Sequence, residues 1–294
     1  MKISKEGMIV SIIIIILFTC ISFFLFFKNM LMIWAIWLNS TPATITAFIN
    51  AGADVNKKSM SGVTPLMTAV TTSNNPEVIR ILINAGADVN AKNISGGTPL
   101  LAASVRPNPE VIAAFINAGA DVNVKNVLGM TPLMTAAGIH SNPEVIAALI
   151  SAGADVNAQD NSGMSPLLHA AWSSPNPQVI MIFIEAGADV NIRNLSGRTP
   201  LMHAIINTFD HNSEVITALI NAGAEVNTQD NSGMTPLSLA ARFSSNPEMI
   251  TTLLNLGADP KAKDNDGKMA IDYAKDNTKL RDTEALRRLE EVSR

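Results

Sequence analysis

The residues of this chain that first suggest chemistry are four aspartates that recur at nearly constant spacing. Asp88, Asp121, Asp155 and Asp189 each follow a Gly-Ala pair. They resemble a series of catalytic carboxylates, but equivalent positions of packed helical units lie roughly 8–10 Å apart, which is one helix-packing step. We therefore interpret these aspartates as loop residues that form local hydrogen bonds, and we predict no catalytic role for them.

Two histidines are the next candidates, as metal ligands. His169 and His203 occupy equivalent positions of two adjacent repeats. A zinc ion takes four ligands, with nitrogens about 2.0–2.1 Å away, and no cysteine or carboxylate cluster completes such a set. The sequence also has no Gly-rich phosphate loop, no His-Glu-x-x-His pair and no Cys-x-x-Cys. We expect no enzyme activity, no metal, no cofactor and no small-molecule substrate.

The elements that position these residues belong to one repeated unit. The string Ala-Gly-Ala-Asp-Val-Asn starts at Ala51, Ala85, Ala118, Ala152 and Ala186. A sixth copy starts at Ala222 with Glu225 in place of Asp, and a seventh, at 256–261, keeps only Gly-Ala-Asp. The steps between copies are 34, 33, 34, 34, 36 and 34 residues. A fixed period of this size predicts a solenoid of stacked units.

One unit, residues 158–191, shows the pattern of local structure. A turn at 160–163 is followed by Ser165-Pro166, where the hydroxyl caps an inner helix and proline occupies its first position. Asn176-Pro177 repeats this start signal for an outer helix, and Gly187 ends that helix. Each helix is too short to be stable alone in water, so its stability must come from packing against neighbouring units.

Thr-Pro-Leu at the start of the inner helix and Gly-Ala-Asp-Val-Asn after the outer helix together resemble the ankyrin repeat. The first motif, in one case with Ser for Thr, begins at Thr64, Thr98, Thr131, Ser165, Thr199 and Thr235. The resemblance covers roughly residues 31–294. It implies an all-α repeat solenoid of helix-turn-helix units, joined by β-turn or hairpin-like loops. It also implies a protein partner bound on the concave face.

The domain organisation follows from this register. We predict a short tail at 1–7, a transmembrane helix at 8–27, a partial N-terminal capping repeat at 31–56, six ankyrin repeats at 57–260 and a polar C-terminal capping repeat at 261–294. Residues 31–38 align with an inner helix. An alternative, which the sequence leaves open, is that Trp34 and Trp37 lie in the membrane interface as an aromatic belt.

The predicted transmembrane helix is a run of 20 uncharged residues. As a helix it is about 30 Å long, the thickness of a bilayer core. A cleaved signal sequence is the alternative, in which case the chain would be an exported or secreted effector. Lys2 and Lys5 precede the run and only Lys28 follows it closely. The positive-inside rule then favours a single-pass membrane protein with an extracytoplasmic repeat domain, on the periplasmic side if the source is bacterial.

Charge and variability between the repeats indicate what the array binds. The chain has a net charge of −4, and an acidic array without basic stripes argues against a nucleic-acid partner. We therefore predict a non-catalytic scaffold for protein–protein interaction, whose partner the sequence does not name. The predicted partner-binding residues on the concave face are Met130, Ile139, Met164, His169, Trp172, Arg193, Arg198, His203, Met234, Arg242 and Phe243.

Overall fold

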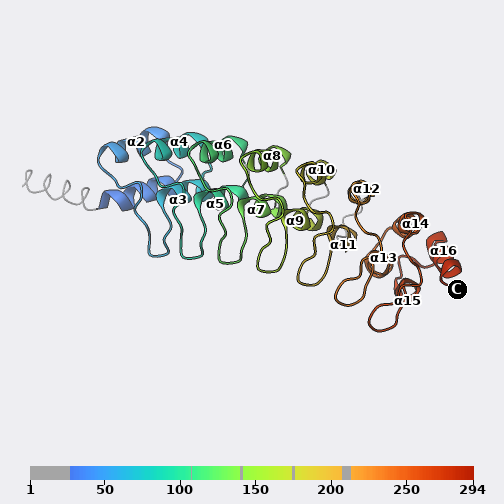
Figure 1. The fold of residues 1–294 in the computed structure, drawn as a ribbon. Helices are drawn as coiled ribbons and strands as arrows, with labels where there is room; N and C mark the ends of the chain where they lie inside the picture. The colour runs from blue at the N-terminus through green and yellow to red at the C-terminus, as the bar shows by residue number, and fades with distance from the viewer. Residues whose placement is uncertain (1–26, 107, 140–141, 174–175, 207–212) are drawn as a thin grey trace, which may run out of the picture.

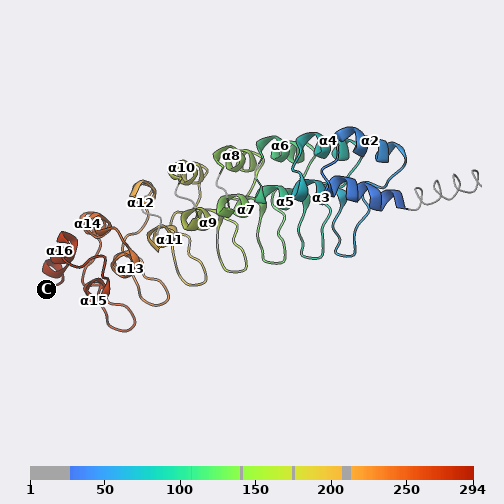
Figure 2. The ribbon, with the colours of Figure 1, turned by 180° about the vertical axis from the view of Figure 1, so that it is seen from behind.

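The computed structural model describes residues 27–106, 108–139, 142–173, 176–206 and 213–294. These residues form two rows of short α-helices that run side by side along an elongated array, and none of them is in a β-strand (Figures 1 and 2). Long loops project from one side of the array and lie next to one another along its length (Figure 1). The predicted all-α ankyrin-repeat solenoid is therefore confirmed for the described part of the chain.

The two rows contain inner and outer helices that alternate along the chain. The inner row begins with helical residues 27–37, and its labelled members are α3 (Pro65–Thr72), α5 (Pro99–Val105), α7 (Pro132–Ile139), α9 (Pro166–Ser173), α11 (Pro200–Ile206), α13 (Pro236–Phe243) and α15 (Ala270–Asp276). The outer row consists of α2 (Pro42–Asn50), α4 (Pro76–Asn84), α6 (Pro109–Asn117), α8 (Pro143–Ser151), α10 (Pro177–Glu185), α12 (Ser213–Asn221), α14 (Pro247–Asn255) and α16 (Glu284–Ser293).

Local sequence signals set where these helices begin and end. Thr64 Oγ1 accepts a hydrogen bond from the backbone N–H of Met67 at 3.2 Å, so the threonine before α3 is its N-cap. The outer helix α8 ends at Ser151, and Gly153, two residues later, has a φ of +89°. Ala154 N–H donates to Leu149 O at 3.0 Å, and Gly153 N–H donates to Ile150 O at 2.9 Å. This pair of bonds is a Schellman motif, and glycine adopts the required left-handed conformation at little cost.

The core lies between the two rows. Leu167 of α9 and Ile180 and Phe183 of α10 are completely buried. Ala170 is also buried, and its small side chain lets adjacent inner helices approach closely. Burial of each unit against the next provides the stability that a single unit of this size lacks.

The asparagine that ends each Ala-Gly-Ala-Asp-Val-Asn string connects consecutive units. Asn123 Oδ1 accepts from the N–H of Asp155 at 2.8 Å, and its Nδ2 donates to Gly153 O at 2.9 Å. The same two bonds are made by Asn56, Asn90, Asn157 and Asn227. Asn191 makes them to Glu225 and Gly223. We name this series the asparagine ladder. It gives the recurring string a structural role that extends beyond ending a helix.

The aspartates of the same string hydrogen-bond locally, as predicted. Asp155 Oδ1 accepts from Asn157 N–H at 2.9 Å, and Asp88, Asp121 and Asp189 make the corresponding bond. The loop tips are joined as well, because Leu195 N–H donates to Ser162 O at 3.0 Å in the preceding loop.

The predicted tail, 1–7, and the predicted transmembrane segment, 8–27, lie outside the described residues except for residue 27. Among the described residues, no helix combines the length and the apolar character needed to cross a membrane. Helical residues 27–37 pack as the first inner helix, since Met32 and Ile36 are buried in the core.

Candidate protein-binding face

The candidate site is the surface formed by the loop tips and the inner helices, which we call the concave face because the array curves toward it (Figure 1). The structure places the eleven predicted residues in three groups. The first group lies two positions before the proline that starts an inner helix and consists of Met130, Met164, Arg198 and Met234. The second group lies at the ends of inner helices and consists of Ile139, Trp172, Arg242 and Phe243. In the third group, His169 and His203 lie within inner helices and Arg193 lies on a loop.

Three apolar residues at the ends of the inner helices are exposed. Trp172 on α9 exposes 48% of its surface, and Ile139 on α7 and Phe243 on α13 are also exposed. These residues are far apart along the array, because α9 and α13 are separated by α11. A partner that contacts both aromatic residues must therefore extend over at least three units.

His169 is held by an aspartate in the loop of its own unit. Its Nε2 lies 3.1 Å from Asp160 Oδ2. Asp160 Oδ1 in turn accepts from the backbone N–H groups of Ser162 and Met164 at 2.7 and 2.9 Å. Burial lowers the pKa of His169, while the neighbouring carboxylate of Asp160 opposes that shift. The histidine therefore positions the loop relative to α9 and remains half-buried.

His203 occupies the equivalent position in the next unit but is buried. Its Nε2 lies 3.1 Å from Asn194 Nδ2, and Asn194 Oδ1 already accepts two backbone N–H groups, so the amide donates to the imidazole. The rings of Trp172 and His203 form a T-shaped contact, with centroids 5.4 Å apart and an interplanar angle of 81°. Burial lowers the pKa of His203 to about 4, with the charges of Arg198 and His169 as further causes.

The structure corrects the predicted exposure of two residues. His203 and Met234 are buried, so neither side chain is available to a partner. Trp172 contacts His203 from the preceding unit, and Nη1 of Arg242 lies 3.8 Å from Met234 Sδ. His203 and Met234 are therefore buried residues that contact an exposed neighbour, which is Trp172 for His203 and Arg242 for Met234.

The arginines of the predicted face differ in how they are held. Nε of Arg198 lies 3.3 Å from Oδ2 of the buried Asp230, so this arginine is neutralised within the array. Nη2 of Arg193 donates to Gln229 O in the next loop at 2.8 Å. Arg242 instead stacks on aromatic rings, with its Cζ 5.0 Å from the centre of Phe243 and 5.4 Å from the centre of Tyr273.

Tyr273 is a member of this cluster that the sequence did not indicate, since the last repeat reads as a polar cap. Its hydroxyl donates to Asp264, and this hydrogen bond raises the pKa of Tyr273 to about 12. Nζ of Lys268 also lies over the ring, 5.4 Å from its centre. A surface hollow of about 330 Å³ opens here, lined by Arg242, Asp266, Lys268, Tyr273, Asp276 and Asn277.

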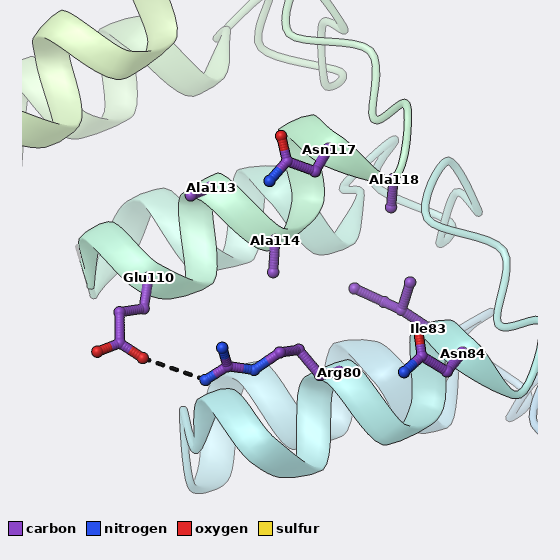
Figure 3. Close-up of a pocket in the computed structure, with 8 residues that line it drawn as sticks. All are labelled: Arg80, Ile83, Asn84, Glu110, Ala113, Ala114, Asn117 and Ala118. Carbon is purple, nitrogen blue, oxygen red and sulfur yellow. Dashed lines mark hydrogen bonds and ion pairs between the residues drawn. The ribbon is translucent and has the colours of Figure 1, made fainter.

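A second hollow, of about 480 Å³, lies between the outer helices α4 and α6. Arg80 and Glu110 pair across one end at 3.1 Å, and small residues such as Ala114 line its wall (Figure 3). Both charged side chains are mostly exposed, so the pair contributes little to stability. The hollow lacks groups arranged for chemistry. Among the described residues, no group of His, Cys, Asp and Glu is placed to hold a metal ion.

Comparison with known families identifies the architecture. The profile of the family described as Ankyrin repeats (3 copies) matches residues 31–126, 100–194 and 168–264. These matches cover most of the chain, so the chain belongs to the ankyrin-repeat family. The family is typically a non-catalytic module for protein interaction. No curated protein matches the chain.

Proposed function

We propose that this protein is a membrane-anchored scaffold that binds a protein partner on its concave face and carries out no reaction itself. Membership of the ankyrin-repeat family supports a protein partner. The partner makes its main contacts with the C-terminal half of the face, where Trp172, Arg242 and Phe243 are exposed.

One observation carries the proposal: framework positions have the same residue type in successive units, whereas positions on this face have different residue types. The asparagine ladder uses the same residue type in unit after unit, at Asn56, Asn90 and Asn123 for example. At one position near the ends of consecutive inner helices, by contrast, stand Trp172, Ile206 and Arg242. Tryptophan and arginine are enriched where interfaces gain most of their binding energy.

The anchor in this proposal is the uncharged run 8–27, with the repeat domain on the extracytoplasmic side. Its support is the length of the run and the excess of lysine before it. An exported effector with a cleaved signal would have a mature chain that starts within or beyond this run. Intact mass of the chain purified from membranes distinguishes the two, since the anchored protein retains residues 1–27.

The binding face is tested by the double substitution Trp172→Ala with Phe243→Ala. The tagged full chain is purified from solubilised membranes, and proteins that copurify are quantified by mass spectrometry. Loss of two hot-spot side chains weakens binding at least about tenfold, and circular dichroism of the purified variant confirms that the array is folded under the conditions of the assay. The control is Met181→Ala, which removes an exposed apolar side chain from the outer helix α10. Equal recovery of the partner by the double variant and this control would reject the proposed face.

A further inference from the structure

The first inner helix has two apolar faces, only one of which is covered. Met32 and Ile36 of helical residues 27–37 are buried in the core. On the other side, Trp34 and Trp37 are 63% and 65% exposed, and Leu38 directly after the helix is 63% exposed. Met30 is exposed as well, one turn before Trp34. Large exposed apolar patches on a folded unit mark interaction sites.

The unit that carries this face has one charged residue before Asp54, which is Lys28 in the first turn of the helix. No charged residue occurs from 29 to 53. The second residue of the outer helix is Ala43 in α2, but it is glutamate in α4, α6, α8, α12 and α14. A repeat at the end of a solenoid needs a polar outer face if it lies in water. The C-terminal unit meets this requirement, with 17 charged residues among residues 261–294, and the N-terminal unit does not.

The same helix is fixed to the array at its first turn. Asn29 Oδ1 accepts from the N–H of Asp54 at 2.7 Å, and Nζ of Lys28 donates to Ala51 O at 3.3 Å. These bonds replace those that a preceding unit would make in the asparagine ladder. Residues 28 and 29 therefore begin the ladder, and no flexible linker separates the apolar run 8–27 from the first repeat.

We propose that Met30, Trp34, Trp37 and Leu38 form a membrane-contact surface, seated in the interfacial layer of a phospholipid bilayer. Tryptophan favours that layer because one part of its ring system is apolar and its N–H can meet water or headgroups. Trp34 and Trp37 lie within roughly 15 Å of residue 27 along the helix axis, and hence close to the membrane that the proposed anchor crosses. The inference rests on that anchor, and it adds that the first repeat lies on the bilayer in a fixed orientation.

The chain offers a direct test because it contains 3 tryptophans, two in this surface and Trp172 on the concave face. The full chain is reconstituted into phosphatidylcholine–phosphatidylglycerol vesicles, with or without lipid brominated near the headgroup end of the acyl chains. Trp172→Phe leaves Trp34 and Trp37 as the only tryptophans, and their emission is excited selectively over that of Tyr273. The matched control is Trp34→Phe with Trp37→Phe, which leaves only Trp172.

In the brominated vesicles, the emission of Trp34 and Trp37 falls about twofold, while that of Trp172 is unchanged. Flotation of the vesicles separates this inference from the proposed anchor. A chain that floats with unquenched Trp34 and Trp37 retains the anchor and overturns the membrane-contact surface. A chain that stays out of the vesicles overturns both. The emission could also stay unquenched because the chain forms a dimer through this face, in which case the double substitution Trp34→Ser with Trp37→Ser would dissociate the dimer. That result would assign the face to a second copy of the chain, and it also overturns the inference.

Discussion

The substitution Asn123→Ala tests whether the asparagine ladder holds the array together. Asn123 joins the unit of α5 and α6 to the unit of α7 and α8 through bonds of 2.8 and 2.9 Å. A hydrogen bond within a protein contributes about 0.5–1.5 kcal/mol net, so two bonds contribute about 1–3 kcal/mol. Because this asparagine is exposed, water replaces part of what is lost, and we expect a loss of about 1–2 kcal/mol.

The loss is measured by urea unfolding of the full chain in detergent, followed by far-UV circular dichroism. The control is Asn117→Ala, since Asn117 is an exposed asparagine at the end of α6 that takes no part in the ladder. In a linear array, a weaker contact between two neighbours also reduces cooperativity, so the transition of Asn123→Ala should broaden. If both variants unfold at the same urea concentration, the ladder does not stabilise the array and the reasoning is refuted.

Two further predictions concern a glycine pair and a buried histidine. Gly153→Ala should lower the free energy of unfolding by about 1–2 kcal/mol, because of the positive φ at this position alone. Gly163→Ala should lower it more, because the added Cβ would also lie 2.8 Å from Leu195 N. Equal losses of stability in urea unfolding would contradict this. Stability should fall by on the order of 3 kcal/mol as pH drops from 6.5 to about 4, where only the unfolded chain protonates His203. His203→Leu, which copies Leu239 of the next unit, should flatten that slope; an unchanged slope would rule out His203 as its source.

The repeat register and the helix starts were predictable because their signals are local. Thr64-Pro65 and Asn75-Pro76 each place a capping oxygen and a fixed φ within two residues, and the structure begins a helix at both prolines. The buried face of α10 was predictable for the same reason, since helical spacing alone aligns Val179, Ile180 and Phe183.

The bonds between units were not predicted, because their partners are far apart in sequence. Asn123 bonds to residues 30 and 32 positions away, and a reading of one unit assigns it only to the loop. The signal was present nonetheless: the asparagine recurs in copy after copy, although a helix stop requires only the glycine. An exposed polar residue that recurs in six consecutive copies points to a bond between the repeats.

Exposure on the concave face was the hardest property to predict, because register does not determine which neighbour covers a side chain. His169 and His203 are equivalent by register, yet His203 is buried while His169 is only half-buried, and the ring of Trp172 from the preceding unit packs against His203. In the same way, Met164 is half-buried while the equivalent Met234 is buried next to Arg242. The shape of a variable surface depends on pairs of residues from adjacent units, and each pair occurs only once in the chain.

The asparagine ladder and the variable concave face consist of different residues, so substitutions on the face need not affect the ladder. The ladder begins at Asn29 and its last asparagine is Asn227, since Lys261 stands at the next equivalent position. Apart from the Lys28 side chain at its start, its bonds join asparagine side chains to the backbone of the Gly-Ala-Asp and Gly-Ala-Glu segments, and Trp172 and Arg242 lie outside these segments. Substitution of an exposed residue on the concave face therefore leaves the bonds of the ladder in place, and the first repeat keeps the orientation that Lys28 and Asn29 impose on it.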